Sequence, residues 1–90
     1  MGEKYILSQE ARIDLLEIKS YYNKLSKTYT KILLNQIINS IKNLYDYPQV
    51  GKDSVFNSKE TQCGNYRIFY LFEDNKIFVV RIIHSSMDFD

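Results

Sequence analysis

The spacing of apolar residues changes near Pro48, and this change constrains the fold more than any other feature of the sequence. Before Pro48, apolar residues recur at intervals of three and four, which is the period of an amphipathic helix. After Gly51, the chain contains short runs of aromatic and β-branched residues, which are typical of strands. A length of 90 residues allows one domain, residues 1–90, with a single core. The sequence therefore predicts an α+β domain in which helices pack against a sheet.

Two helices in succession are predicted before Pro48. Ser8 is suited to cap the first helix, because its hydroxyl can accept a free backbone N–H of the first turn. Ser26 or Thr28 can cap the second helix, and Pro48 ends it just beyond Asp46. The two helices are expected to form an antiparallel hairpin, because only a few residues join them. The stripes expected to face the sheet are Ala11, Leu15, Ile18, Tyr22 and Leu25, then Leu34, Ile37, Ile38, Ile41, Leu44 and Tyr45.

Strands are predicted on both sides of the helical hairpin. A short strand over residues 4–8 precedes it, and a weak, polar strand is indicated by Val55–Phe56 and Lys59–Cys63. Two stronger strands follow over Tyr66–Phe72 and Ile77–His84. The expected order is β-α-α-β-β-β, with the helices packed on one face of a mainly antiparallel sheet.

The last two strands carry apolar side chains on both faces, so one apolar face is left uncovered by helices. We expect that face to form an exposed groove that binds a partner. If Asp74-Asn75 is a two-residue turn, residues whose numbers sum to 149 lie opposite each other. Arg67 and His84 then share a face and Arg81 lies on the other, although a one-residue change in the turn would exchange the faces. The expected pairs include Phe69–Val80 and Arg67–Ile82.

The net charge of +1 conceals an asymmetry between the two halves of the chain. Residues 1–45 hold seven Lys/Arg and four Asp/Glu, whereas residues 46–90 hold five and seven. The excess lysines of the first half form either a solvated helical face or a docking surface for an acidic partner or for phosphates. The pI of about 7.8 is low for a chain whose main task is to bind nucleic acid. The lysines between Ile18 and Tyr45 are Lys19, Lys24, Lys27, Lys31 and Lys42.

Several classes of site and location are disfavoured by composition. One Cys and one His are too few for a dedicated metal site, and no cofactor is expected. No apolar run approaches the ~20 residues that span a bilayer. The first four residues are not followed by the apolar core of a signal peptide, so we expect the chain to stay in the cytoplasm.

Four segments, in order and spacing, resemble toxins of the RelE/ParE superfamily. The resemblance runs from about Tyr5 to Asp88 and implies the element order given above. It also implies a toxin of a type II toxin–antitoxin module, neutralised by a small antitoxin whose disordered arm folds onto the toxin. The segments are Tyr5-Ile6-Leu7-Ser8-Gln9-Glu10-Ala11, Leu44…Pro48-Gln49-Val50-Gly51, Tyr66-Arg67-Ile68-Phe69-Tyr70 and Ile82-Ile83-His84-Ser85-Ser86-Met87-Asp88.

The superfamily contains two activities, and the resemblance favours one of them. RelE-like members cleave ribosome-bound mRNA with clustered lysines, arginines and a C-terminal Tyr, whereas ParE-like members inhibit DNA gyrase. Here Ser58 and Glu60 stand where RelE-like proteins have lysines, and the last tyrosine is Tyr70. Cleavage of a phosphodiester requires cationic groups around the phosphate, and this sequence lacks that cluster. The ParE branch is therefore the closer match, and no catalytic residue is expected. The alternatives are a diverged nuclease using Arg67, His84 and Glu60, or an attenuated member that only binds antitoxin.

The candidate binding residues lie on the uncovered sheet face and on the lysine-rich helical face. Arg67 can anchor a carboxylate of the antitoxin or pair with Asp88. For His84, a structural role with hydrogen bonds is favoured over a role as a general base. Tyr66 and Tyr70 alternate with Arg67 like a base-stacking platform, but their spacing favours the core. The full candidate set for binding antitoxin or target is Arg67, Phe69, Leu71, Phe78, Val80, His84, Met87, Lys24, Lys27 and Lys31.

Overall fold

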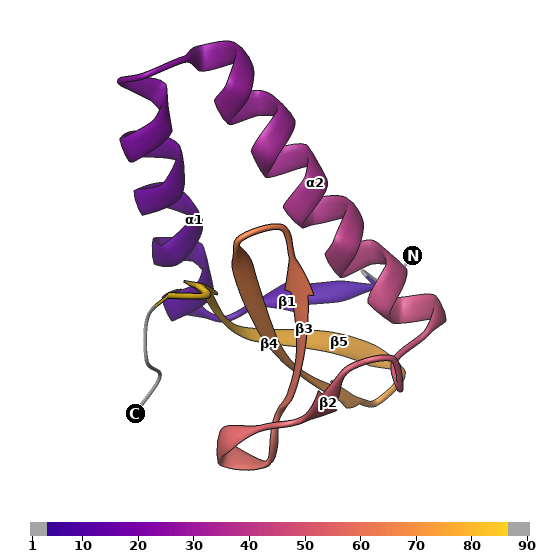
Figure 1. The fold of residues 1–90 in the computed structure, drawn as a ribbon. Coiled ribbons are helices and arrows are strands. Elements are labelled where there is room, and N and C mark those ends of the chain that lie inside the picture. The colour runs from indigo at the N-terminus through magenta and orange to yellow at the C-terminus, as the bar shows by residue number, and fades with distance from the viewer. Residues whose placement is uncertain (1–3, 87–90) are drawn as a thin grey trace.

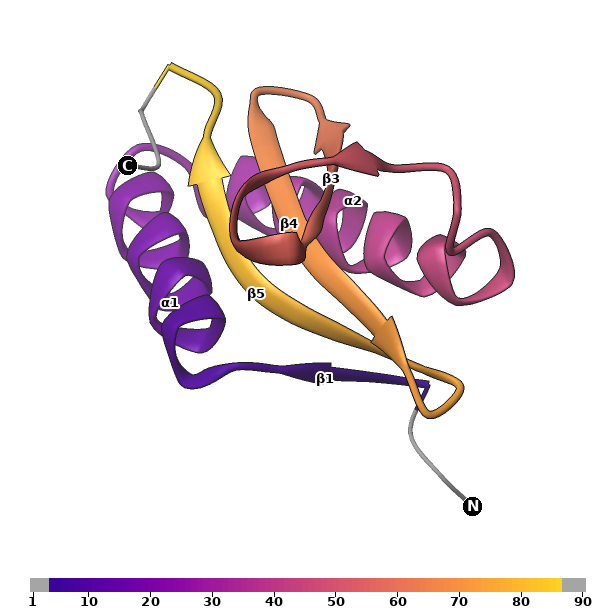
Figure 2. The same ribbon diagram turned by 90° about the horizontal axis from the view of Figure 1, so that it is seen from below.

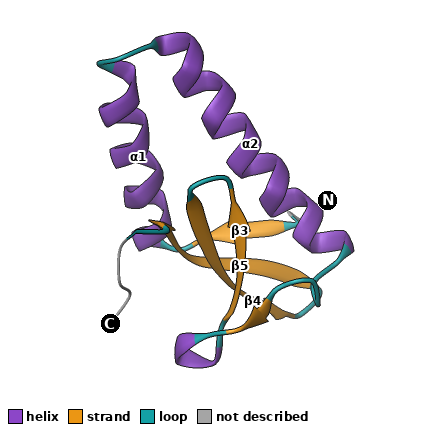
Figure 3. Ribbon diagram, viewed as in Figure 1, coloured by secondary structure: helices purple, strands orange, loops and turns teal. Residues whose placement is uncertain are grey.

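The computed structural model describes residues 4–86, except for the side chain of Phe56 (Figure 1). A five-stranded sheet lies beneath two long helices, as the colouring by element type also shows (Figure 3). The elements are β1 (Tyr5–Leu7), α1 (Gln9–Asn23), α2 (Lys27–Asp46), β2 (Lys52–Asp53), the 3₁₀ turn η1 (Val55–Asn57), β3 (Lys59–Cys63), β4 (Tyr66–Glu73) and β5 (Lys76–His84). The predicted α+β order is confirmed. Two details differ, because Val55–Phe56 belongs to a 3₁₀ turn rather than a strand, and β2 was not predicted.

The sheet has the strand order β1-β5-β4-β3-β2. Only β1 runs parallel to its neighbour, β5, and all other pairs are antiparallel. Both helices cover one face of the sheet, and η1 lies over the opposite face, where it crosses in front of β4 and β5 (Figure 2). Within the described range, neither helix combines the length and the hydropathy needed to cross a bilayer.

Serine side chains cap both helices. The Ser8 hydroxyl accepts the N–H of Ala11 at 3.0 Å, as predicted. Ser26, rather than Thr28, caps α2 by accepting the N–H of Tyr29 at 3.1 Å. Since α2 ends at Asp46, the position of its C-terminus also follows the prediction.

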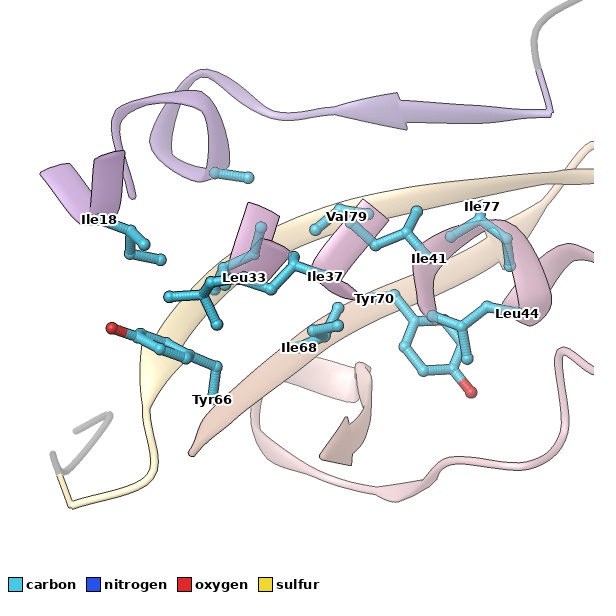
Figure 4. Packing of buried hydrophobic residues seen from close by; sticks show 12 residues of the cluster. Ile18, Leu33, Ile37, Ile41, Leu44, Tyr66, Ile68, Tyr70, Ile77 and Val79 are labelled. Atoms are coloured by element: carbon cyan, nitrogen blue, oxygen red, sulfur yellow. The ribbon is translucent and has the colours of Figure 1, made fainter. Parts of the chain in front are cut away.

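The core lies between the helices and the sheet (Figure 4). In α2, Ile37, Ile41 and Leu44 are buried as predicted, but Leu33 is buried where Leu34 was predicted, and Leu34 is only half-buried. Leu25, predicted to be in the core, is 69% exposed because it lies in the turn beyond α1. The buried cluster comprises Ala11, Ile18, Leu33, Ile37, Ile41, Leu44, Tyr66, Ile68, Tyr70, Ile77, Val79 and Ile82.

Tyr70 ties the segment after α2 to the centre of the sheet. Its hydroxyl accepts the N–H of Gly51 at 3.0 Å and donates to the carbonyl of Pro48 at 2.9 Å. A Cβ on residue 51 would meet the Tyr70 hydroxyl and would lie 2.9 Å from the Glu60 carbonyl oxygen. Gly51 is therefore required by a close approach of backbone to sheet. Tyr70 is a core residue, as its spacing predicted.

The β4–β5 hairpin follows the predicted register near its turn and departs from it further on. Asp74 and Asn75 both have positive φ, 51° and 62°, which is the geometry of a two-residue hairpin turn. For Tyr70 to Glu73, the residue numbers of each pair sum to 149 as predicted. An irregularity between Phe69 and Tyr70 shifts the pairs farther from the turn by one residue. Val80 is the extra residue, as in a β-bulge, and its carbonyl accepts the Ser8 hydroxyl at 2.7 Å.

Candidate protein-binding site

The uncovered sheet face is less open than the sequence predicts. Phe69, at its centre, is only 1% exposed, while Leu71, Phe78 and Val80 are half-buried. The turn η1 lies over this face (Figure 2), and the guanidinium of Arg67 lies over the Phe69 ring at 5.4 Å. The prediction of an exposed apolar groove is therefore wrong at Phe69.

Arg67 is held beside Glu60 on this same face. Nη1 of Arg67 lies 3.6 Å from Oε2 of Glu60, and the other carboxylate oxygen accepts the Ser54 hydroxyl at 2.7 Å. Both members of the ion pair are largely withdrawn from solvent, with side chains 23% and 12% exposed. The positive charge of Arg67 is thus balanced locally by the residue that stands in a lysine position of RelE-like proteins.

His84 does not share a face with Arg67, which corrects the sequence prediction. The bulge pairs His84 with Tyr66 and Arg67 with Ile83. The His84 ring packs edge-to-face on the Tyr66 ring, with centroids 5.3 Å apart, so it lies on the helix-facing side of the sheet. Its Nδ1 accepts the backbone N–H of Ser86 at 3.2 Å and lies 2.7 Å from the Ser86 hydroxyl.

The sequence prediction also misplaces Arg81, which pairs with Phe69 rather than lying beside Ile68. Its Nε and Nη2 donate to the two carboxylate oxygens of Asp14 at 2.8 and 3.0 Å. Asp14 is 6% exposed and also accepts the backbone N–H of Ile82 at 2.9 Å. The hydrogen bonds to this carboxylate raise the pKa of the Arg81 guanidinium. Asp14 and Arg81 therefore clamp α1 to β5.

The remaining candidates lie on the helical hairpin or outside the described residues. Lys24, Lys27 and Lys31 are exposed. Two of them, Lys27 and Lys31, line a hollow of about 610 Å³ with Lys19, near the connection between the helices. Met87 lies outside the described residues.

A groove between the helices is a further candidate binding feature. Its central hollow has a volume of about 390 Å³, and the wall is apolar apart from Arg12 and Lys19. This hollow shares Lys19 and Leu34 with the lysine-lined hollow, and Leu7 and Arg12 with a hollow beside β1. We call the three together the hairpin groove. Its central part is lined by Leu7, Arg12, Leu15, Leu16, Lys19, Leu34 and Ile38.

Sequence reasoning missed part of this groove. It assigned Leu15, Leu34 and Ile38 to the core, and these half-buried side chains do pack against the core, but they also line the groove. It gave Leu16 no role, although this side chain is 63% exposed. The signal was present, because Leu16 lies four residues after Arg12 and three before Lys19, on a helix face outside the core stripe.

The open edge of β1 borders the same groove. β1 is the terminal strand of the sheet, and all three of its residues line the hollow beside it together with Lys42 and Asp46 of α2. Ile77 donates its N–H to the Lys4 carbonyl at 3.1 Å, and the Ser8 N–H donates to the Val79 carbonyl at 2.9 Å. Because alternate residues of an edge strand pair inward, the main-chain groups of Tyr5 and Leu7 face the open side.

Comparison with known families matches this architecture to one family. The sequence model described as "ParE toxin of type II toxin-antitoxin system, parDE" matches residues 5–89. This chain belongs to the ParE toxin family. The RelE/ParE resemblance inferred from the sequence is thereby confirmed, and so is its ParE branch.

A solved structure supports the ParE fold independently. The chain described as "Chromosomal ParDE TA system from P. aeruginosa" superposes with a TM-score of 0.78. The match covers 90% of this chain and 94% of the other, at 17% sequence identity. At that identity the similarity concerns the fold. No curated protein matches the sequence.

The described residues of the ParE chain form no cluster of potential metal ligands. Between residues 4 and 86, no three His, Cys, Asp or Glu side chains gather closely enough to form a ligand set. What the described residues do offer is an apolar groove with cationic side chains along it, next to an open strand edge. Such an arrangement is suited to binding a peptide segment.

Proposed function

We propose that this ParE-family toxin inhibits DNA gyrase by binding to it, and that a cognate antitoxin neutralises it by occupying the hairpin groove. The observation that carries the antitoxin part is the groove itself, an apolar hollow along α1 and α2 with basic side chains at both ends. Both proposed partners require the toxin to act in the cytoplasm.

The chemistry of the groove specifies the antitoxin segment. Apolar side chains of Leu15, Leu34 and Ile38 would receive the apolar face of an amphipathic helix. The basic residues along the groove outnumber Asp46, the acidic residue among the described lining. An acidic segment is therefore complementary, and its association should be fast and sensitive to salt. The basic residues are Lys4, Arg12, Lys19, Lys27, Lys31 and Lys42.

The β1 edge provides a second mode of attachment for the same antitoxin. Outward main-chain groups at Tyr5 and Leu7 can pair with an extended segment that leaves the groove. Addition of a strand would extend the sheet on its β1 side, since β1 is terminal. Ordering a flexible antitoxin arm costs free energy, and contacts with both the groove and the strand edge would offset that cost.

Inhibition by binding, rather than RNA cleavage, is supported by the position of the polar candidates. Cleavage needs a base, an acid and a group that stabilises the phosphorane in one site. Arg67 is paired with Glu60, so a phosphate would have to compete with that carboxylate. His84 lies on the opposite face of the sheet, beside Tyr66. The three nuclease candidates therefore do not form one constellation.

Two parallel assays test the target. Purified toxin is added to a gyrase supercoiling reaction, and separately to ribosomes translating a defined mRNA. We expect supercoiling to fall with toxin concentration and the mRNA to remain intact. Codon-specific cleavage with normal supercoiling would assign the chain to the nuclease alternative. Antitoxin binding without either effect would identify it as an attenuated member.

A further inference from the structure

A second hollow lies on the other side of α1 from the hairpin groove. It occupies about 490 Å³ between α1 and the end of β5, and we call it the tyrosine cleft. Its walls include the rings of Tyr21, Tyr22, Tyr66 and His84. A helix turns about 100° per residue, so Glu17 and Tyr21 project away from the side of α1 that carries Leu16. The two hollows are separate sites.

The aromatic rings of the tyrosine cleft stand at steep angles to one another. Tyr21 and Tyr22 are perpendicular, with centroids 4.9 Å apart. Tyr66 and His84 make an angle of 81° at 5.3 Å. Tyr21 is 61% exposed, whereas Tyr66 is 7% exposed at the base. Because aromatic faces carry partial negative charge, a cation can bind against the exposed ring of Tyr21.

The charged groups of the cleft add to this preference. Its basic residue in the described lining, Arg81, is neutralised by the Asp14 carboxylate. Glu17 lines the same cleft, and Glu10 contributes to the negative potential that acts on Arg81. Nδ1 of His84 lies 3.2 Å from the backbone nitrogen of Ser86. Apart from the Asp14–Arg81 pair, the acidic side chain in the described lining is Glu17.

We propose that the tyrosine cleft binds an arginine side chain from a protein partner. A planar guanidinium can stack on a ring while donating hydrogen bonds to Glu17 and to tyrosine hydroxyls, and it is more weakly hydrated than an ammonium group. The acidic antitoxin segment proposed for the hairpin groove would be repelled here. The cleft therefore serves a partner segment of the opposite charge, and this inference does not depend on the gyrase assignment.

Nuclear magnetic resonance titration of the full chain tests the proposal. The probe is an acetylated and amidated Gly-Gly-Arg-Gly-Gly peptide. Its control contains citrulline, which has nearly the same shape as arginine but no charge. We expect the arginine peptide to shift the resonances of Tyr21, Tyr66 and His84 with a Kd of roughly tens of millimolar, as expected for one exposed cation–π contact with one ion pair. The citrulline peptide should leave these resonances unchanged.

Matched substitutions separate the cleft from general effects. Tyr21→Ala and Glu17→Gln should each lower the affinity for the arginine peptide roughly threefold. Tyr47→Ala and Glu73→Gln replace exposed residues outside the cleft and should not change the affinity. The proposal is overturned if citrulline binds as well as arginine, if the shifts cluster around Leu16 and Lys19, or if no saturable shift occurs. Antitoxin affinity should be unchanged in Tyr21→Ala, so failure here is distinguishable from failure of the groove assignment.

Discussion

The clamp between α1 and β5 predicts a graded loss of stability when Asp14 is changed. Asp14 is buried and accepts three hydrogen bonds, two from Arg81 and one from the backbone of Ile82. Asp14→Ala removes both carboxylate oxygens and with them all three hydrogen bonds. Asp14→Asn keeps one acceptor oxygen but loses the charge and places an N–H₂ group against a donor.

The structure sets the expected magnitudes. The buried Ile82 N–H loses its partner in Asp14→Ala, which costs about 1–3 kcal/mol. The Arg81 side chain is 33% exposed, so water can solvate the released guanidinium and the lost ion pair contributes only about 1 kcal/mol. The total is about 2–4 kcal/mol for Asp14→Ala and roughly half of that for Asp14→Asn.

Urea unfolding monitored by circular dichroism measures these differences. With an m value of roughly 1.5 kcal/mol per molar, Asp14→Ala should lower the midpoint by roughly 2 M. Glu17→Gln, an exposed change on the same helix, should leave the midpoint in place. A midpoint for Asp14→Ala within roughly 0.3 M of the wild-type value would refute the reasoning, because the buried N–H would then have found another acceptor.

Two further predictions concern the tyrosines of the core. Gly51→Ala should destabilise the fold by about 1–3 kcal/mol, because the added Cβ meets the Tyr70 hydroxyl. Thermal unfolding measures this loss, and adding Tyr70→Phe to the same chain should recover part of it. An unchanged melting temperature in Gly51→Ala would contradict the close packing. Burial, and secondarily a hydrogen bond with Tyr22, raise the pKa of the Tyr66 hydroxyl. Folding therefore favours the neutral phenol, so this contribution to stability is complete below the ordinary tyrosine pKa of about 10 and is lost as the pH rises above it. Urea midpoints on both sides of that value should fall less steeply in Tyr66→Phe than in the wild type, and equal slopes would contradict the assignment.

Local signals predicted most of the fold. The caps at Ser8 and Ser26, the end of α2 before Pro48 and the turn at Asp74-Asn75 each depend on a few adjacent residues. The bulge at Val80 could not be predicted in this way, because it is stabilised by Ser8, which is 72 residues away in sequence. That single extra residue moved His84 to the other face of the sheet from Arg67.

The candidate site was harder to predict than the fold. The spacing of apolar residues does not reveal that a core-facing side chain also lines a groove, as Leu34 and Ile38 do. The burial of Phe69 was also unpredictable, because it depends on three-dimensional packing over the sheet, where the Arg67 guanidinium lies over the Phe69 ring. The lysines were predicted to form either a solvated helical face or a docking surface, and three of them, Lys19, Lys27 and Lys31, line the hollow at one end of the groove.

The most direct test combines the groove and the target in one gyrase supercoiling assay. Leu16 is 63% exposed, so Leu16→Glu should fold normally while placing a carboxylate in the apolar part of the hairpin groove. Val50→Glu, an aliphatic residue 66% exposed and outside the groove, is the matched control. We predict that saturating antitoxin restores supercoiling to reactions containing wild-type toxin or Val50→Glu, while reactions containing Leu16→Glu stay inhibited. Equal rescue of all three proteins, or no inhibition by any of them, would contradict the account.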